Sequence, residues 1–339
     1  MFFYFTASLD WYLCVLLYNF LAYAMQAPLG LLADRLSKNW LLALAGCVLI
    51  IAAFAICMLI DTDQFVLVAV TLLGIGYALF HLGGGIDVLN VSEGRFGPVG
   101  LFISPSAFGI FFGTMLGKGK WGIAHIVVGA LIAIAILIIV VRLLMGRSYP
   151  RNAPFSLEMS GATRAGSQQK TLSIALLFAA ICFFLVVFLR SYAGMILNYE
   201  LKSPSDLWLF TMFGVVPGTA IGGFLADRFG ALRIATISLG IAAVLFLFAT
   251  MPNPGIMAII SFSITIPITL CSMVRVFPGA KGFSLGLLTF GLFLGFLPAY
   301  LGLVPPSGPV VDVSLAAISL ALLWPALRIA LGTIKKKEG

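Results

Sequence analysis

The sequence has very little charge, since only 9% of its 339 residues are Asp, Glu, Lys or Arg, against about 25% in an ordinary soluble domain. Hydrophobic residues make up 61% of the chain, and the mean hydropathy is +1.13. Apolar runs follow one another with short breaks. Each run has about the 20 residues that a membrane-spanning helix needs, and about twice the length of a barrel strand. The composition excludes a soluble domain and predicts an all-α polytopic membrane protein.

Sequence motifs for enzyme chemistry are missing as well. There is no Gly-Lys-Ser/Thr nucleotide loop, no His-Glu-x-x-His zinc pattern and no Gly-x-Ser-x-Gly elbow. The five cysteines lie within apolar runs without metal-ligand spacing, so we interpret them as packing residues. We therefore expect no enzyme activity, no ATP-driven pumping, no metal and no cofactor.

Basic residues outnumber acidic ones by 20 to 12, which gives a net charge of +8. They lie in short breaks between apolar runs and at the C-terminus, so membrane topology explains them better than binding to nucleic acid. If the break after Asp34 faces the cytoplasm, sixteen of the 20 basic residues fall on that side. This bias predicts a multi-pass protein of the cytoplasmic (plasma) membrane with its C-terminus in the cytoplasm. No Lys or Arg precedes Arg35, which predicts an N-terminus outside.

The apolar runs give eleven candidate spans. They are residues 11–32, 40–60, 64–90, 98–117, 122–142, 171–194, 206–225, 231–250, 255–275, 283–303 and 311–332. The stretch 143–170 is rich in Pro, Gly, Ser and Gln and predicts a flexible cytoplasmic linker. The sequence thus predicts an N-terminal bundle of five spans (1–142) and a C-terminal bundle of six (171–339). Span 171–194 has no counterpart in the first bundle, which we expect to lack its first helix.

A four-residue sequence occurs once in each half, where a long apolar run ends. Leu32-Ala33-Asp34-Arg35 recurs as Leu225-Ala226-Asp227-Arg228, with Gly30 and Gly223 two residues before the Leu. An Asp-Arg pair is costly inside lipid but not at a helix end, so each copy marks a turn out of the membrane. Two copies at matching places indicate a duplicated protein.

Glycines also repeat at matching spacings of nine and four residues in one span of each half. They are Gly100, Gly109 and Gly113 in the first half, and Gly282, Gly291 and Gly295 in the second. Residues four apart share a face of a helix, so the last two of each set predict a small-residue seam for helix packing. Simple close packing and a role in transport both remain open.

The segments Gly30 to Lys38 and Gly223 to Gly230 resemble the signature loop of the major facilitator superfamily. The resemblance implies two helical bundles with inverted repeats that rock about a central cavity, with the two loops as cytoplasmic gates. Ser37 stands where a glycine is usual in that loop. The Gly100, Gly109 and Gly113 ladder is similar to a motif of the superfamily's drug and proton antiporters. Ala78-Leu79-Phe80-His81 resembles fosmidomycin-resistance-type efflux proteins.

Ionisable side chains at membrane depth are costly, so each is a candidate for handling substrate or protons. His81 is a candidate for proton coupling, because an unperturbed imidazole titrates near neutral pH, or else it is a core histidine bonded to a neighbouring helix. Asp87 either relays protons or, as we expect, pairs with Arg35 or Arg95 to hold the gate. Arg190 either binds an anionic substrate bidentately or, as we slightly favour, reaches to the outer interface.

Two groups of uncharged polar residues complete the candidates. Asn19, Tyr23 and Gln26 share one face of the first span, where they line a cavity or belong to the gate. Ser263 and Thr265 make span 255–275 polar, and Pro267 would kink it. With few charges facing a cavity, and 13% aromatic residues, the cavity is expected to be apolar.

These features predict a monomeric secondary transporter that moves a small hydrophobic or amphipathic organic solute across the lipid bilayer by alternating access. Its coupling partner is expected to be the proton, with export of the solute. An uptake symporter of the same architecture remains open. A non-transporting membrane sensor or an inactive transporter remnant also remains open, and the expected lack of a first helix supports this alternative.

Overall fold

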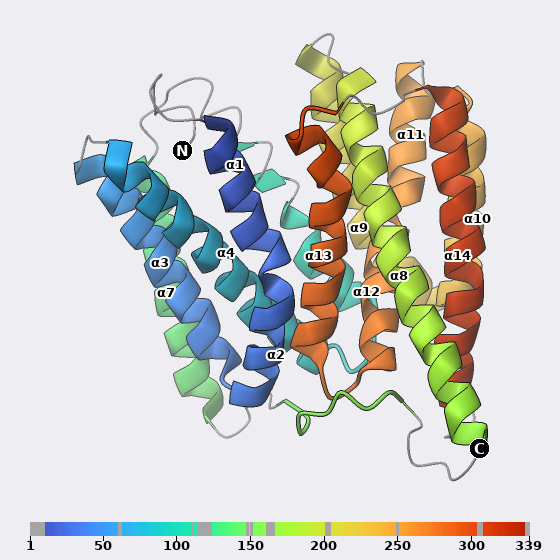
Figure 1. Ribbon diagram of the computed structural model, residues 1–339, viewed down its shortest axis with the longest axis horizontal. Helices are drawn as coiled ribbons and strands as arrows, with labels where there is room; N and C mark the ends of the chain where they lie inside the picture. The colour runs from blue at the N-terminus through green and yellow to red at the C-terminus, as the bar shows by residue number, and fades with distance from the viewer. Residues whose placement is uncertain are drawn as a thin grey trace.

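The computed structural model describes residues 11–59, 63–106, 108–109, 112–113, 124–146, 149, 152–160, 167–200, 205–248, 251–303 and 308–335. Within these ranges the chain is helical and contains no strand (Figure 1). The elements are α1 (Trp11–Asn19), η2 (Phe20–Ala24), α2 (Gln26–Leu36), α3 (Asn39–Leu59), α4 (Asp63–Val91), α5 (Gly97–Ile103), α7 (Ala124–Met145), α8 (Ser167–Glu200), α9 (Ser205–Phe229), α10 (Ala231–Phe246), α11 (Pro252–Ser263), α12 (Thr265–Val276), α13 (Lys281–Tyr300) and α14 (Pro309–Lys335).

Eight helical segments in the described ranges are long and apolar enough to cross a membrane. They are Tyr12–Leu36, Asn39–Leu59, Phe65–Val91, Ala124–Met145, Thr171–Gly194, Asn253–Val276, Lys281–Tyr300 and Pro309–Gly332. Helix α10 is apolar but shorter, and half of the predicted span 98–117 beyond α5 lies outside the described residues. The protein is an all-α polytopic membrane protein, as its composition predicts.

Two of the predicted spans depart from a regular α-helix near their middle. In span 11–32, one π-helical turn, η2, separates α1 from α2; such turns recur at functional sites of helices. Span 255–275 divides at Ile264 into α11 and α12. The break lies three residues before Pro267, which has no N–H to donate and so frees a carbonyl of the preceding turn. The predicted kink is therefore confirmed.

The helices form two bundles that meet along two pairs of helices. In the first bundle α3 packs against α4 and α7, and in the second α8 packs against α13 and α14. Between the bundles, α2 and η2 lie along α13, and α5 lies along α9. Figure 1 shows α1 and α2 descending beside α13, and segment 152–160 crossing beneath both bundles. The start of α1 and the end of α14 lie at opposite ends of the helices.

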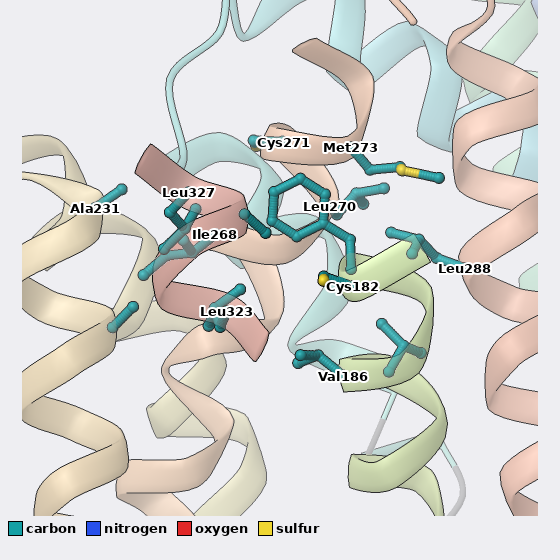
Figure 2. Close-up of a cluster of buried hydrophobic side chains, with 14 of the residues drawn as sticks. Cys182, Val186, Ala231, Ile268, Leu270, Cys271, Met273, Leu288, Leu323 and Leu327 are labelled. Atoms are coloured by element: carbon teal, nitrogen blue, oxygen red, sulfur yellow. The ribbon is translucent and has the colours of Figure 1, made fainter. Parts of the chain in front are cut away.

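The second bundle has a continuous hydrophobic core, part of which is drawn in Figure 2. Cys182 and Val186 of α8 point towards Ile268 of α12 and Leu323 of α14. Each of these four side chains is buried, and helices within a bilayer are held together by the van der Waals contacts of such closely packed side chains. This core fixes α8, α12 and α14 relative to one another.

The matching glycines of the two halves differ in their surroundings. A Cβ on Gly291 would lie 3.2 Å from the Phe184 ring, and one on Gly295 would lie 2.5 Å from the carbonyl of Phe188, both on α8. A Cβ on Gly109 or Gly113 would meet nothing within 4 Å in the part of the chain that the structure describes. The predicted seam is thus present as a helix contact in the second half. In the first half, α7, the span that follows Gly109 and Gly113, has none of its residues buried among those that the structure describes.

Candidate functional site

The Asp34 carboxylate connects the two bundles at one end of the molecule. It lies in the last turn of α2, is 3% exposed, and accepts the backbone N–H of Gly282 at 2.8 Å and of Phe283 at 2.9 Å. Both amides belong to the first turn of α13, where N–H groups have no partner within the helix and the helix dipole favours a negative charge. Asp34 therefore caps a helix of the opposite bundle.

Asp227, the matching residue of the second repeat, makes the reciprocal contact. It lies near the end of α9, and its two carboxylate oxygens accept the backbone N–H of Phe96 at 2.8 Å and of Gly97 at 2.7 Å. These amides begin α5 of the first bundle. Each bundle thus supplies one aspartate and one helix N-terminus. We call the two contacts together the crossed caps.

Glycines let the backbones come close enough for the crossed caps to form. A Cβ on Gly30 would collide with the backbone of Gly282, and a Cβ on Gly223 would collide with the backbone of Phe96. A Cβ on Gly100 would lie 2.6 Å from the carbonyl oxygen of Thr219, again across the bundle interface. A side chain at these positions forces the helices apart, so the predicted gating glycines have a steric function.

The basic residues of the two repeats lie at the surface around the crossed caps. The Arg35 guanidinium lies 5.1 Å from the centre of the Phe155 ring, and that of Arg228 lies 5.6 Å from the Phe229 ring. Lys38 is exposed at the start of α3. The gating role predicted for these cations therefore does not include an ion pair with Asp34 or Asp227 in the described residues.

Asp87 does not make the predicted pair with Arg35 or Arg95 in the described part of the chain. Its carboxylate accepts a hydrogen bond from Asn39 Nδ2 at 2.8 Å and another from the Tyr149 hydroxyl, while Arg95 Nε donates to the nearby Ser92 carbonyl. Burial, and then the adjacent carboxylate, raise the pKa of Tyr149. The phenol stays protonated at neutral pH and serves as a donor. The neutral side chains of Asn39 and Tyr149 thus bind the Asp87 carboxylate, the role that the charge pattern assigned to an arginine.

The segment 152–160 of the predicted flexible linker packs against both bundles. Asn152 exchanges two hydrogen bonds with Asn39 and accepts a third from Asn90 Nδ2 at 2.9 Å, which ties it to α3 and α4. Further along, the N–H of Ser156 donates to the Gly279 carbonyl at 3.2 Å and that of Ser160 to the Val276 carbonyl at 3.0 Å. This segment therefore spans the bundle interface beside the crossed caps.

Sequence reasoning missed these linker contacts, and it also missed the role of Lys281. The Lys281 Nζ donates to Asn90 Oδ1 at 2.8 Å and to the Leu89 carbonyl at 3.2 Å, so α13 is tied to the end of α4. A signal for Asn39 and Asn90 was present, because amide side chains at the ends of apolar spans need polar partners. Nothing in the pattern indicated which partners those would be.

His81 lies among aromatic rings in the first bundle. Its imidazole is stacked on Tyr77 at 5.7 Å between ring centres and lies 5.8 Å from Phe102. Its Nδ1 is 3.1 Å from Gln26 Oε1. Because Gln26 Nε2 donates to the Ala22 carbonyl at 2.6 Å, its oxygen faces the imidazole, and the network assigns the proton to Nδ1. His81 is thus bonded to a neighbouring helix.

The polar face predicted on the first span is divided between different environments. Asn19 donates to the Val15 carbonyl one turn back at 2.8 Å, while the Tyr23 ring lies 5.4 Å from that of Tyr77. Gln26 is fully buried, and a Cβ on Gly286 of α13 would collide with the backbone of Gln26. Gln26 therefore belongs both to the His81 cluster and to the contact between bundles.

Arg190 reaches a hydroxyl inside the second bundle rather than the outer interface that we slightly favoured. Its Nη1 donates to Thr265 Oγ1 at 3.1 Å, and the Thr265 hydroxyl donates in turn to the Phe262 carbonyl at 3.0 Å. Thr265 is 1% exposed and Ser263 is buried beside the same break between α11 and α12. Among the described residues, no cluster of His, Cys, Asp or Glu could hold a metal ion.

Comparison with known proteins identifies the fold. No protein-family model and no curated protein sequence matches the chain. Among solved structures, it is similar to the Escherichia coli fucose:proton symporter, a major facilitator superfamily transporter, in its outward conformation. The TM-score is 0.62 at 14% identity, over 96% of this chain and 91% of that one. The human organic anion transporter MFSD10 gives 0.61 at 14% identity, over 94% and 81%. A bacterial homologue of the iron transporter ferroportin gives 0.58 at 14%, over 95% and 90%. The chain therefore has the two-bundle fold of the major facilitator superfamily transporters.

Proposed function

We propose that this protein is a secondary transporter that works by alternating access, and that the crossed caps are its closed gate. The observation that carries the proposal is the reciprocity of Asp34 on α13 and Asp227 on α5. Rocking the bundles apart at this end breaks both contacts together and opens a path between them. The proposed fold relationship supports the same cycle, because the similar structures named above are transporters.

The gate is assigned to the cytoplasmic side of a plasma membrane. The topology expected from the sequence puts sixteen of the 20 Lys and Arg residues on the side of the gate, and basic residues accumulate on the cytoplasmic side of membrane proteins. In this orientation the chain begins outside and ends in the cytoplasm. The state with intact crossed caps is then closed to the cytoplasm.

The solute is proposed to be small and hydrophobic or amphipathic. At the end away from the gate, a cavity of about 320 Å³ lies between the first span and α13, and only apolar side chains line it: Leu13, Leu16, Leu17, Phe20, Phe293 and Leu297. Such a lining favours apolar solutes by removing their surface from water. It gives no hydrogen-bond donors or acceptors for a sugar.

The proposed energy source is the proton gradient, which drives export of the solute through proton coupling. His81 Nδ1 is held by Gln26, which leaves Nε2 to take up a proton. Gln26 also contacts α13, so we expect protonation of His81 to change the contact between the bundles through Gln26. Asp87 is the second candidate for the proton path, through Tyr149 and Asn39.

Flux measurements test this function. Purified protein in liposomes with an imposed pH gradient should move a solute from a panel of lipophilic cations, organic anions and antibiotics, and a pH dye should report accompanying proton movement. Asp34→Asn and Asp227→Asn should slow turnover and leave binding intact. His81→Ala should abolish the pH dependence. No flux and no ligand-dependent thermal shift across the panel would reject transport, and the direction of flux separates export from uptake.

A non-transporting sensor or transporter remnant is the second candidate function. Among the described residues, Gly109 and Gly113 meet no helix as Gly291 and Gly295 do, and α7 has no buried residue, so the described part of the first bundle is less completely packed than the second. A sensor would bind solute without flux. Ligand-dependent thermal shifts in the absence of flux would favour it over a transporter.

A further inference from the structure

Arg190 points into the second bundle, within a membrane-spanning segment. It lies in Thr171–Gly194 of α8, four residues after Val186 and seven after Phe183, both of which are buried. Residues at these spacings share one face of a helix. Its partner Thr265 lies near the middle of the membrane segment Asn253–Val276. The guanidinium is therefore at membrane depth.

No carboxylate compensates the charge of Arg190 within the described part of the chain. Its hydrogen-bond partner is the neutral Thr265 hydroxyl, whose own proton goes to the Phe262 carbonyl, so the hydroxyl only accepts. One of the five guanidinium N–H donors is satisfied in this way. On insertion scales an arginine costs about 2.5–3.5 kcal/mol at the centre of a membrane helix and less near its ends, and Arg190 lies four residues before the end of Thr171–Gly194. A neutral polar residue would hold Thr265 at a much lower cost.

Arg190 is accessible enough to meet a ligand. It is partly exposed, unlike Thr265 beneath it, and Thr265 fixes one N–H so that the planar group is held in place. The remaining N–H pairs can bind a carboxylate, sulfonate or phosphate oxygen pair in the bidentate manner typical of arginine. Six residues before Arg190, α8 presents the Phe184 ring towards α13, where it lies 6.1 Å from the Phe290 ring between ring centres.

We propose that Arg190 binds the anionic group of the transported solute, which makes the substrate an amphipathic organic monoanion. This inference rests on the proposed transport function and adds the charge of its substrate. One cation without a compensating acid matches one negative charge, and the apolar body of the solute is the one already proposed from the apolar cavity beside α13. Thr265 is a positioning residue that orients the guanidinium.

Matched naphthalene derivatives test the inference on the intact chain in lipid nanodiscs. The probes are naphthalene-2-sulfonate, the neutral 2-naphthamide and the cationic 2-naphthyltrimethylammonium, which share one ring system and differ in charge. The wild type should bind the sulfonate more tightly than the other two. Arg190→Gln should weaken binding of the sulfonate by about 10- to 100-fold, the range of a lost charge-assisted contact. The same change should leave binding of the amide unaltered.

Two further variants separate recognition from a structural role. Arg190→Lys keeps the charge and loses the planar donor pair, so sulfonate binding should be intermediate. Thr265→Val removes the acceptor and should reduce sulfonate affinity less than Arg190→Gln does. The control Arg233→Gln removes a charge from an exposed position in α10 and should change nothing. Thermal unfolding of every variant is measured in parallel.

The outcomes separate this inference from transport itself. Wild-type binding that ignores charge, or sulfonate binding that survives Arg190→Gln, would overturn the anion assignment. If the amide or the cation is then carried in the liposome assay, the transport function stands without it. If Arg190→Gln fails to fold, the wild-type preference decides: at least tenfold for the sulfonate over the amide supports the inference, and equal affinity rejects it.

Discussion

Ser37 and Gly230 occupy the same place in the two signature loops, directly after the helices that carry Asp34 and Asp227. Both have a positive φ, +52° at Ser37 and +91° at Gly230, but ψ differs, at 28° for Ser37 and 131° for Gly230. A positive φ ends a helix at low cost with glycine and costs an L-residue about 1–2 kcal/mol. Ser37 therefore ends α2 in a left-handed conformation without the usual glycine, and this strain lies three residues after Asp34.

Substitution by alanine should have opposite effects on stability at two glycines with equal space around them. Gly230→Ala should lower the free energy of unfolding by about 1 kcal/mol, because alanine is strained at φ +91°. Gly240→Ala, within α10, should raise it by about 0.5–1 kcal/mol through helix propensity. A Cβ meets nothing within 4 Å at either position. Thermal unfolding in detergent measures both, and shifts of the same sign would contradict the conformational explanation.

At the scale of helices, the gate depends on two close crossings, α2 with α13 and α5 with α9. Each crossing places an aspartate on a helix N-terminus and a glycine against the opposing backbone. A helix N-terminus offers several N–H groups in one direction, so a carboxylate is bound only while the crossing is intact. Attraction and steric fit thus act on the same pair of elements.

Gly30→Ala should open the gate, while Gly109→Ala should not. The added methyl group at residue 30 collides with the backbone of Gly282, whereas at residue 109 it meets nothing within 4 Å in the described chain. Because the closed state is lost from the cycle, flux in the liposome assay should fall by about tenfold or more for Gly30→Ala, the effect of roughly 1.4 kcal/mol. Equal flux in the two variants would show that the α2–α13 crossing is not needed.

The repeated Leu-Ala-Asp-Arg sequence predicted the two gate residues, because a charge pair marks a membrane exit wherever it occurs. Their partners were not predictable. The amides that bind Asp34 are backbone groups some 250 positions away, and backbone donors leave no trace in residue type. The Asp87 partners were mispredicted for a related reason, since one of them, Tyr149, belongs to a segment whose composition resembles a linker. The helix break near Pro267 was predictable, because its cause, the missing N–H of a proline, is local to the sequence.

At the scale of the molecule, both crossed caps lie at one end, and segment 152–160 joins the two bundles beside them. If the bundles move as rigid bodies, neither cap can open alone. The hydrophobic core that fixes α8, α12 and α14 supports such movement for the second bundle. The first bundle has fewer buried residues on α7 to hold it together.

Hydrogen exchange should reveal whether the two caps open together. In Asp34→Asn, exchange should accelerate at Gly282 and Phe283, and also at Phe96 and Gly97 on the other side of the gate. Asp227→Asn should give the same pattern, because each loss favours the same open state. Mass spectrometry of peptides covering residues 92–100 and 280–286 measures this. Acceleration confined to the partner of each substituted aspartate would mean that the caps act independently.

The crossed caps also imply that opening takes up water. When the bundles separate, the buried Asp34 carboxylate and the four amides of Phe96, Gly97, Gly282 and Phe283 lose their partners, and these groups must then be solvated. Water has to enter before the passage is complete. Opening is therefore an osmotically sensitive step: a solute too large to enter the passage, present in the cytoplasm at high osmolality, withdraws that water and holds the protein shut.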